Sequence, residues 1–235
     1  MFELRSPIPR RFFNARTHCL LTQVFGENKN RLFYGPKGHQ GIDFRTKRAV
    51  QFLFHRLLGW VKKVATRKNT AGTIPIVAAH DGFLSEPFND DKKYGIYMRV
   101  VAKPEEEGEK TVQYRTLYFH LDKVRVWKND PITTGHELRH GENYIPMGAV
   151  VGYSGNTGRY TTGAHLHFQL ERREKMGSGW GGWAIVDPMP YFVDQTIYQL
   201  YRGMGTPSRY FYLGKEITRE RVRAIGVLPI DYRKV

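Results

Sequence analysis

One stretch decides the fold of this chain: Gly163-Ala164-His165-Leu166-His167-Phe168-Gln169-Leu170. The alternation of polar and apolar residues predicts a β-strand, on which residues two apart point to the same face. His165 and His167 therefore present two imidazoles side by side, between apolar residues that point into a core. Alone, this pair is weak evidence for a metal site, since a pair of histidines on a strand is more often hydrogen-bonded within the protein than bound to a metal.

A second cluster of candidate ligands lies upstream, in Gly38-His39-Gln40-Gly41-Ile42-Asp43-Phe44. His39 and Asp43 are four apart, so on an extended segment they face the same way, and Gly41 between them leaves open space. A third piece is the strand-like run Leu117-Tyr118-Phe119-His120-Leu121. Two imidazoles and one carboxylate form an established ligand set for catalytic zinc, which keeps a fourth position for water. One carboxylate leaves such a site net positive, which suits the activation of water and the polarisation of a carbonyl.

These motifs resemble those of the lysostaphin-type (LytM-like, M23) zinc metallopeptidases. That family is marked by H-x-x-x-D, by a Tyr-x-His-Leu-like segment, and by S-G-x-T-G followed by H-x-H. The chain has all of them in the family's order, in His39…Asp43, Tyr118-Phe119-His120-Leu121, Ser154-Gly155-Asn156-Thr157-Gly158 and His165-Leu166-His167. The resemblance runs from roughly Thr22 to Phe192, with insertions.

The resemblance implies a mainly β fold: an antiparallel β-sheet domain with an inserted amphipathic helix and peripheral loops. It implies one zinc ion per chain, held by His39, Asp43 and His167, with His120 and His165 as active-site histidines that do not bind zinc. Spacing alone cannot choose the ligand within His165-Leu166-His167. We hypothesise that His165 is mainly the general base and His120 mainly the donor to the oxyanion. The implied activity is that of an endopeptidase acting on the peptide stems or cross-bridges of peptidoglycan.

At 235 residues the chain can bury a substantial core, and the motifs suggest three parts. We expect an extended basic N-terminal arm at 1–20, a peptidase domain at 21–193, and a C-terminal extension at 194–235. The peptidase domain carries insertions at about 46–70 and 136–146. The C-terminal extension either packs back on the domain or docks a partner, and the sequence does not decide between these.

The two insertions each carry a pattern of their own. Apolar residues from Thr46 to Thr70 recur at three- and four-residue steps, which predicts a basic amphipathic helix. This helix either packs on the β core or lies on an anionic surface. His136-Glu137-Leu138-Arg139-His140 matches the helical zinc-protease motif, but Gly135 and Gly141 bracket it. We therefore predict a polar loop there and not a second zinc site.

Local patterns predict further elements. Alternating residues predict a first strand at Thr22–Gly26 and later strands at Tyr94–Ala102, Thr111–His120 and Met147–Tyr153. Thr218 is followed by Arg219-Glu220-Arg221-Val222-Arg223, which predicts a short helix capped by the threonine.

Charge and cysteine content restrict the partners. The net charge is +15 and the pI is near 9.9, so the surface suits polyanions. No nucleic-acid-binding signature is found, so we do not expect nucleic acid as a partner, and peptidoglycan and anionic envelope polymers fit better. Proteins of an envelope or virion are further candidate partners, which would bind the C-terminal extension. Cys19 is the only cysteine, which excludes an intrachain disulfide and a thiolate-rich zinc site, and we expect it to be a small buried hydrophobe.

The sequence also suggests where the protein works. It has no apolar run of about 18 residues, and its first residues lack an apolar signal region. We expect action in the periplasm or the extracellular wall, reached by a route other than a signal peptide if Met1 is the native start. A phage lysin or virion-associated hydrolase fits this better than a cellular remodelling enzyme. The alternative is a catalytically silent structural or wall-binding module of an envelope or virion assembly.

Overall fold

A computed structural model describes residues 1–10, 18–31, 36–46, 74–90, 93–124, 144–159, 161, 163–200 and 207–225. In these ranges the protein is mainly β, as the sequence predicts. The elements, in order, are β1 (His18–Gln23), β2 (Ile42–Arg45), β3 (Pro75–Val77), β4 (Gly82–Asp90), β5 (Gly95–Val101), β6 (Glu105–Glu107), β7 (Lys110–Val124), β8 (Tyr144–Ile145), β9 (Val150–Ser154), β10 (His165–Met176), β11 (Gly179–Trp180), β12 (Ala184–Val186), η3 (Met189–Tyr191), β13 (Ile197–Leu200), β14 (Arg209–Tyr212), β15 (Lys215–Ile217) and α3 (Arg219–Ala224).

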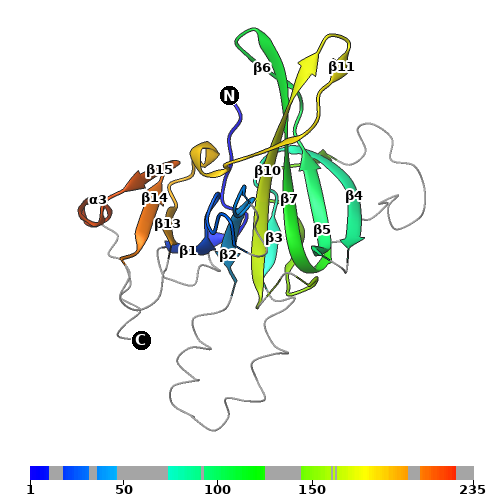
Figure 1. Ribbon diagram of the computed structural model, residues 1–235. Helices are drawn as coiled ribbons and strands as arrows, with labels where there is room; N and C mark the ends of the chain where they lie inside the picture. The colour runs from blue at the N-terminus through cyan, green and yellow to red at the C-terminus, as the bar shows by residue number, and fades with distance from the viewer. Residues whose placement is uncertain are drawn as a thin grey trace.

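The strands join in one sheet whose main path is β15-β14-β13-β1-β2-β10-β7-β5-β4-β8 (Figure 1). The long strands β7 and β10 form its middle, with β6 and β11 at their outer tips. Pairing is antiparallel except between β1 and β13, which run parallel, so the sheet is mixed and not purely antiparallel as expected.

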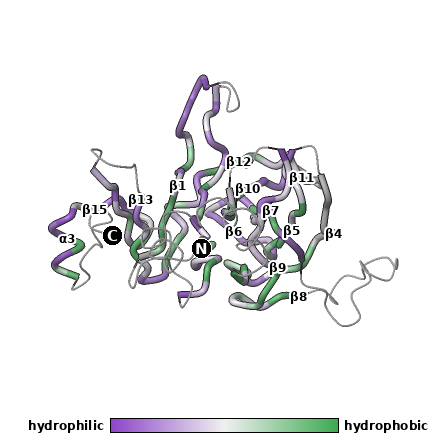
Figure 2. Tube along the Cα trace, turned by 90° about the horizontal axis from the view of Figure 1, so that it is seen from below, coloured by the Kyte–Doolittle hydropathy of each residue, from purple (hydrophilic) through white to green (hydrophobic). Residues whose placement is uncertain are grey.

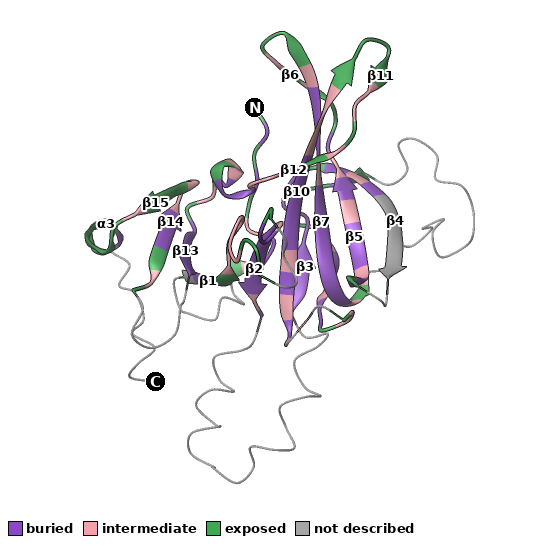
Figure 3. Ribbon diagram, in the orientation of Figure 1, coloured by how far each residue is buried: buried purple, intermediate pink, exposed green. Residues whose placement is uncertain are grey.

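Strict alternation separates the two faces of β10. Leu166, Phe168 and Leu170 are fully buried in the main core, whereas His165 and His167 on the other face are partly exposed. The same alternation on β7 turns Tyr114 and other large side chains inward. Figure 3 shows that burial is greatest in the middle of these strands and falls off toward the tips of β6 and β11. One face of the central strands therefore builds the core and leaves the other face for the histidines.

The N-terminal segment packs against this core. Phe2, Leu4 and Ile8 are buried, and Leu4 pairs with Phe192 in an isolated bridge. The first strand was predicted too late, because β1 covers His18–Gln23 and not Thr22–Gly26. Alternation alone could not reveal that Gly26 lies in a turn with φ of 75°.

The C-terminal segment extends the sheet. Figure 2 shows β1 largely in the hydrophobic colour, whereas β15 and α3, beyond it, are largely hydrophilic. Tyr198 on β13 is fully buried, with its ring 4.9 Å from Phe192 and 6.1 Å from Phe44. The capped helix is confirmed as α3, where the Thr218 side chain accepts a hydrogen bond from the Arg221 N–H.

Of the other expectations, some are confirmed and two fall on residues outside the described ranges. The strands predicted at Tyr94–Ala102, Thr111–His120 and Met147–Tyr153 correspond to β5, β7 and β9. Cys19 is buried, as expected for a small hydrophobe. The amphipathic helix within Thr46 to Thr70 and the loop containing His136 to His140 lie outside the described residues. Among the residues that the structure describes, no helix is long and apolar enough to cross a membrane.

His80, at the turn into β4, links the folding stability of the protein to pH. Its Nδ1 lies 2.7 Å from the Asp81 carbonyl oxygen and its Nε2 3.0 Å from Thr116 Oγ1. Burial lowers the pKa of His80 from 6.5 to about 4, although the Asp81 carbonyl and carboxylate oppose the shift. Between these two pKa values His80 is protonated in the unfolded chain but neutral in the folded chain. Stability is therefore complete above about pH 6.5 and is lost as pH falls toward about 4.

Replacing His80 with glutamine should remove this contribution. We expect the free energy of unfolding of the wild type to fall by roughly 3 kcal/mol more than that of His80→Gln over this pH range. Urea unfolding of both proteins, in chelator to exclude metal binding, measures the difference. Two parallel pH dependences would show that His80 titrates alike in the folded and unfolded states.

Candidate active site

The candidate site begins with a direct cross-strand pair. β2 and β10 are antiparallel neighbours, and their register sets Asp43 opposite His167. Directly opposed residues share a face of the sheet, so the two side chains meet without any bend of the chain. His167 Nδ1 lies 2.9 Å from Asp43 Oδ1. Spacing in the sequence predicted neither this register nor the choice of His167 over His165, and it was the family resemblance that implied His167.

His39 reaches the pair from the turn before β2. Its N–H donates to the Glu27 carbonyl oxygen at 2.7 Å, and its own carbonyl oxygen accepts from the Gly26 N–H at 2.8 Å. Gly38 makes this approach possible, because it has φ of 71° and a Cβ there would lie 2.6 Å from Gly26 O. His39 Nδ1 lies 3.3 Å from the Val24 carbonyl oxygen, so Nδ1–H donates there and Nε2 faces the pair.

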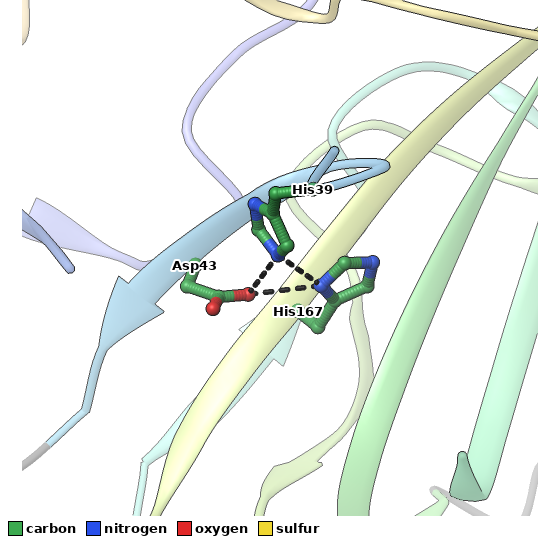
Figure 4. Close-up of side chains that lie close together, drawn as sticks. All are labelled: His39, Asp43 and His167. Carbon is green, nitrogen blue, oxygen red and sulfur yellow. Dashed lines mark hydrogen bonds and ion pairs between the residues drawn. The ribbon is translucent and has the colours of Figure 1, made fainter. Parts of the chain in front are cut away.

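Three atoms from these residues form a compact triangle (Figure 4). His39 Nε2 lies 3.1 Å from Asp43 Oδ1 and 3.0 Å from His167 Nδ1, and the third edge is 2.9 Å. Zinc–ligand distances of about 2.0–2.1 Å in a tetrahedral site require ligand atoms about 3.3 Å apart. The triangle fits a zinc ion after small outward shifts of each side chain. The Val24 carbonyl is the kind of outer partner that orients a histidine ligand.

Electrostatics in the triangle follow from burial and close pairing. Burial alone would raise the pKa of Asp43, but hydrogen bonds from His167 and His39 hold it far below its usual range. Burial lowers the pKa of His167 despite its bond to Asp43. At His39 the hydrogen bond and charge of Asp43 outweigh burial and raise the pKa. Asp43 is therefore ionised, and a proton on His39 competes directly with a metal ion.

His120 enters the site through a β-bulge in β7. Tyr118 pairs with Met98 and Leu121 pairs with Ile96, so β7 has one residue more than β5 between these pairs. His120 has φ of 61°, a left-handed conformation that is uncommon outside glycine. Such a bulge re-aims side chains. It turns His120 toward the site, with its ring centroid 4.8 Å from that of His165.

His120 and His165 are held in the same way, each by a backbone carbonyl oxygen. His120 Nδ1 lies 2.9 Å from Thr157 O, and His165 Nδ1 lies 2.7 Å from Gly163 O. With Nδ1–H donating, Nε2 of each neutral ring is a proton acceptor. Burial, and then the charge of His165, lower the pKa of His120 to about 4. A neutral His120 in this tautomer has no Nε2 proton to donate, which does not favour the oxyanion role expected from the sequence.

Thr157 is a functional residue to which sequence reasoning gave no role. Its hydroxyl donates to the Leu121 carbonyl oxygen at 2.7 Å and accepts from the Ile96 N–H at 3.0 Å, while its carbonyl holds His120. Gly95 packs so closely that a Cβ there would lie 2.2 Å from Thr157 Oγ1. The motif Ser154-Gly155-Asn156-Thr157-Gly158 was the available signal, but nothing in it indicates which atom faces His120.

The structure gathers all five predicted site residues at one place. His39, Asp43 and His167 form the triangle, and among the described residues they are the cluster able to hold a metal ion. His165 stands beside it, with Nε2 3.8 Å from Asp43 Oδ1. The prediction that His165 and His167 share one face of a strand is confirmed. The geometry suits a metal-assisted hydrolysis with two histidines available for proton transfer.

Comparison with solved structures finds several M23 peptidases. The catalytic domain of the antimicrobial peptidase lysostaphin from Staphylococcus simulans is 22% identical, with 78% of this chain and 97% of that chain covered and a TM-score of 0.45. LytU is 27% identical, with 74% and 83% covered and a TM-score of 0.41. The catalytic domain of the prophage-encoded M23 protein EnpA from Enterococcus faecalis is 19% identical, with 74% and 91% covered and a TM-score of 0.40. No curated protein matches the chain.

The family assignment comes from a sequence model. The model described as peptidase family M23 matches residues 62–178. This range contains His120, His165 and His167, whereas His39 and Asp43 precede it and are joined to it by the pairing of β2 with β10. The order of the motifs, their convergence in space and this match lead to one conclusion: the chain belongs to peptidase family M23.

Proposed function

We propose that this protein is a zinc-dependent endopeptidase that cleaves peptide stems or cross-bridges of bacterial peptidoglycan. The observation that carries the proposal is the triangle of His39 Nε2, Asp43 Oδ1 and His167 Nδ1, with edges of 2.9–3.1 Å. These atoms would hold one zinc ion, which supplies a Lewis acid for the peptide carbonyl and lowers the pKa of water toward 7. Membership of a peptidase family supports the same reaction class.

The two other histidines supply the proton transfers. The backbone carbonyls at Nδ1 fix each ring so that Nε2 faces the site. His165 lies nearer the carboxylate of Asp43 and is our candidate for the main base. Once protonated, its Nε2–H can donate to the leaving amine. His120 has the same tautomer, so we propose it as a second acceptor and proton carrier.

The setting of the reaction is part of the proposal. Peptidoglycan lies outside the cytoplasmic membrane, so the protein would act in the periplasm or the extracellular wall. The basic surface, with a net charge of +15, supports attraction to anionic envelope polymers. A phage lysin or virion-associated hydrolase remains our preferred context, with β13 to α3 as the candidate surface for virion or envelope proteins.

Removal and return of metal tests the proposed activity. Purified full-length protein should clear a suspension of purified peptidoglycan, lose that activity in chelator, and regain it with one equivalent of zinc. Mass spectrometry of the released fragments should show new amino termini within the stems or cross-bridges, which cleavage of the glycan or of the glycan–peptide amide does not produce. A protein that binds peptidoglycan and zinc but releases no fragments would instead be the catalytically silent wall-binding module.

A further inference from the structure

The sheet face that carries the site continues along β7 and β10 as a different kind of surface. His165, His167, Gln169, Glu171 and Arg173 alternate with core residues and so share one face of β10. On β7 the residues paired with four of them lie on the same face: Phe119 opposite His167, Leu117 opposite Gln169, Arg115 opposite Glu171 and Gln113 opposite Arg173. Arg99 on β5 pairs with Leu117 and extends the row sideways.

Beyond Gln169 this face becomes rich in arginine and tryptophan. We name it the Arg–Trp surface and define it by five side chains: Arg99, Arg115, Arg173, Trp180 and Trp183. The two tryptophans come from β11 and from the residue before β12, beside the outer half of β10.

The positive charges of Arg115 and Arg173 are only partly neutralised by a neighbouring carboxylate. Arg115 Nε pairs with Glu171 Oε2 at 2.5 Å, and Glu171 also accepts from the Gln169 amide. Arg173 donates to the neutral Gln113 amide oxygen through both Nε and Nη2. Burial and the charge of Arg115 lower the pKa of Arg173, and burial and the charge of Arg99 act in the same direction on Arg115. Arg115 and Arg173 thus repel each other beside one carboxylate, that of Glu171.

The tryptophans hold these charges in place without neutralising them. Arg173 Cζ lies 4.6 Å from the Trp180 ring centroid and 4.4 Å from that of Trp183. Arg115 Cζ lies 4.2 Å from the Trp183 ring. Stacking occupies the flat faces of the guanidinium groups, so their N–H edges remain able to donate. Both tryptophans and both arginines are partly exposed, so a ligand can reach them.

The Arg–Trp surface lies at a defined distance from the metal triangle. Glu171, the partner of Arg115, lies four positions after His167 on β10, and Arg173 lies six positions after it. At about 3.3 Å per residue these separations are roughly 13 and 20 Å. An extended peptide lying along β10 with its cleaved bond at the triangle would therefore reach the surface four to six residues away.

We propose that the Arg–Trp surface binds free carboxylate groups of a peptidoglycan peptide, four to six residues from the bond cleaved at the metal triangle. This inference rests on the proposed function. The planar fork of an arginine donates two parallel hydrogen bonds to a carboxylate, which a lysine cannot do. The Arg–Trp surface and the peptidase site lie on the same face of β10, which favours a peptide over a separate phosphate polymer.

The test compares Arg173→Gln with wild type on two forms of one substrate. The probe is purified peptidoglycan freed of phosphate polymers, either native or with its carboxylates converted to amides by carbodiimide and ammonia. We expect Arg173→Gln to lower the initial rate on native wall about tenfold, the scale of one charge-assisted interaction. Amidation should slow the wild type to a similar extent, and it should not slow Arg173→Gln further.

Matched variants exclude other causes. Lys110→Gln makes the same change of net charge at the start of β7, where Lys110 pairs with Glu174 at 3.0 Å, and it should leave the rate unchanged. Arg173→Lys keeps the charge but not the fork, and it should recover only part of the rate. An equal loss in Lys110→Gln, or an equal loss of Arg173→Gln on native and amidated wall, would overturn the proposal.

Binding without hydrolysis separates this inference from the proposed function. In a His39→Ala background, co-sedimentation with native wall should weaken about tenfold on addition of Arg173→Gln, and binding to amidated wall should not. Carboxylate-dependent binding by a wild type that releases no fragments would refute the peptidase and leave the Arg–Trp surface standing. Hydrolysis with binding indifferent to Arg173 and to amidation would refute the surface alone.

Discussion

Asp43→Asn is expected to reduce wall hydrolysis by about three orders of magnitude or more and to remove the bound zinc. Asp43 supplies the single carboxylate of the triangle and lies 2.9 Å from His167 Nδ1 and 3.1 Å from His39 Nε2. Asparagine keeps the shape but loses the negative charge. Two neutral imidazoles and an amide oxygen hold a divalent cation far less tightly than a set with one carboxylate.

Two readouts check this result. Elemental analysis after dialysis should give about one zinc per wild-type chain and less than about 0.1 per Asp43→Asn chain, and turbidity of a wall suspension gives the rate. Glu106→Gln, on the exposed strand β6, makes the same change of charge and serves as the control. A variant that keeps both zinc and near-normal hydrolysis would exclude the triangle as the catalytic metal site.

The second large effect comes from a residue that contributes no ligand atom, Gly41. The sequence suggested that Gly41 leaves open space between His39 and Asp43, but the structure fills that space with β10. A Cβ on Gly41 would lie 2.5 Å from the Phe168 carbonyl oxygen and 2.8 Å from His167 Nε2. The carbonyl belongs to a strand paired with β2, so relieving both contacts requires β2 to shift away from β10 and the His167 ring to turn.

Gly41→Ala should therefore lower wall hydrolysis by about 100-fold or more and weaken zinc binding, with every ligand still present. Competition for zinc against a chromogenic chelator measures the affinity, and thermal unfolding shows whether the fold survives. Gly179→Ala, on β11 where nothing lies within 4 Å of the new Cβ, should match the wild type. If Gly41→Ala binds zinc and cleaves wall normally, the packing of β2 against His167 is looser than described.

The sequence predicted the site better than it predicted the sheet. Two motifs, H-x-x-x-D and H-x-H, contained His39, Asp43 and His167, because ligand chemistry restricts which residue types can serve, and the family resemblance implied His167 within the second motif. Alternation also predicted which residues of β10 face the core. It could not predict the bulge at His120, since one inserted residue leaves the apolar pattern of β7 readable while it redirects a side chain.

Contacts made by backbone atoms could not be predicted from the sequence. The carbonyl oxygens of Val24, Thr157 and Gly163 orient three histidines, and any residue type could supply them. The parallel pairing of β1 with β13 joins His18 to Ile197, two residues far apart in the chain, and no local pattern encodes it. The Arg–Trp surface is likewise visible only when the register of β7 and β10 is known.

The pairing of β13 with β1 restricts how this peptidase can be truncated or fused to other domains. β13 covers one edge of β1, and β1 in turn flanks β2, which bears Asp43. A version ending at residue 193 would expose unpaired amide and carbonyl groups along β1 and uncover Phe44. The exposed edge strand could then pair with other chains and promote aggregation. Anyone grafting a new targeting module onto this catalyst should therefore attach it after α3, and not in place of the final strands.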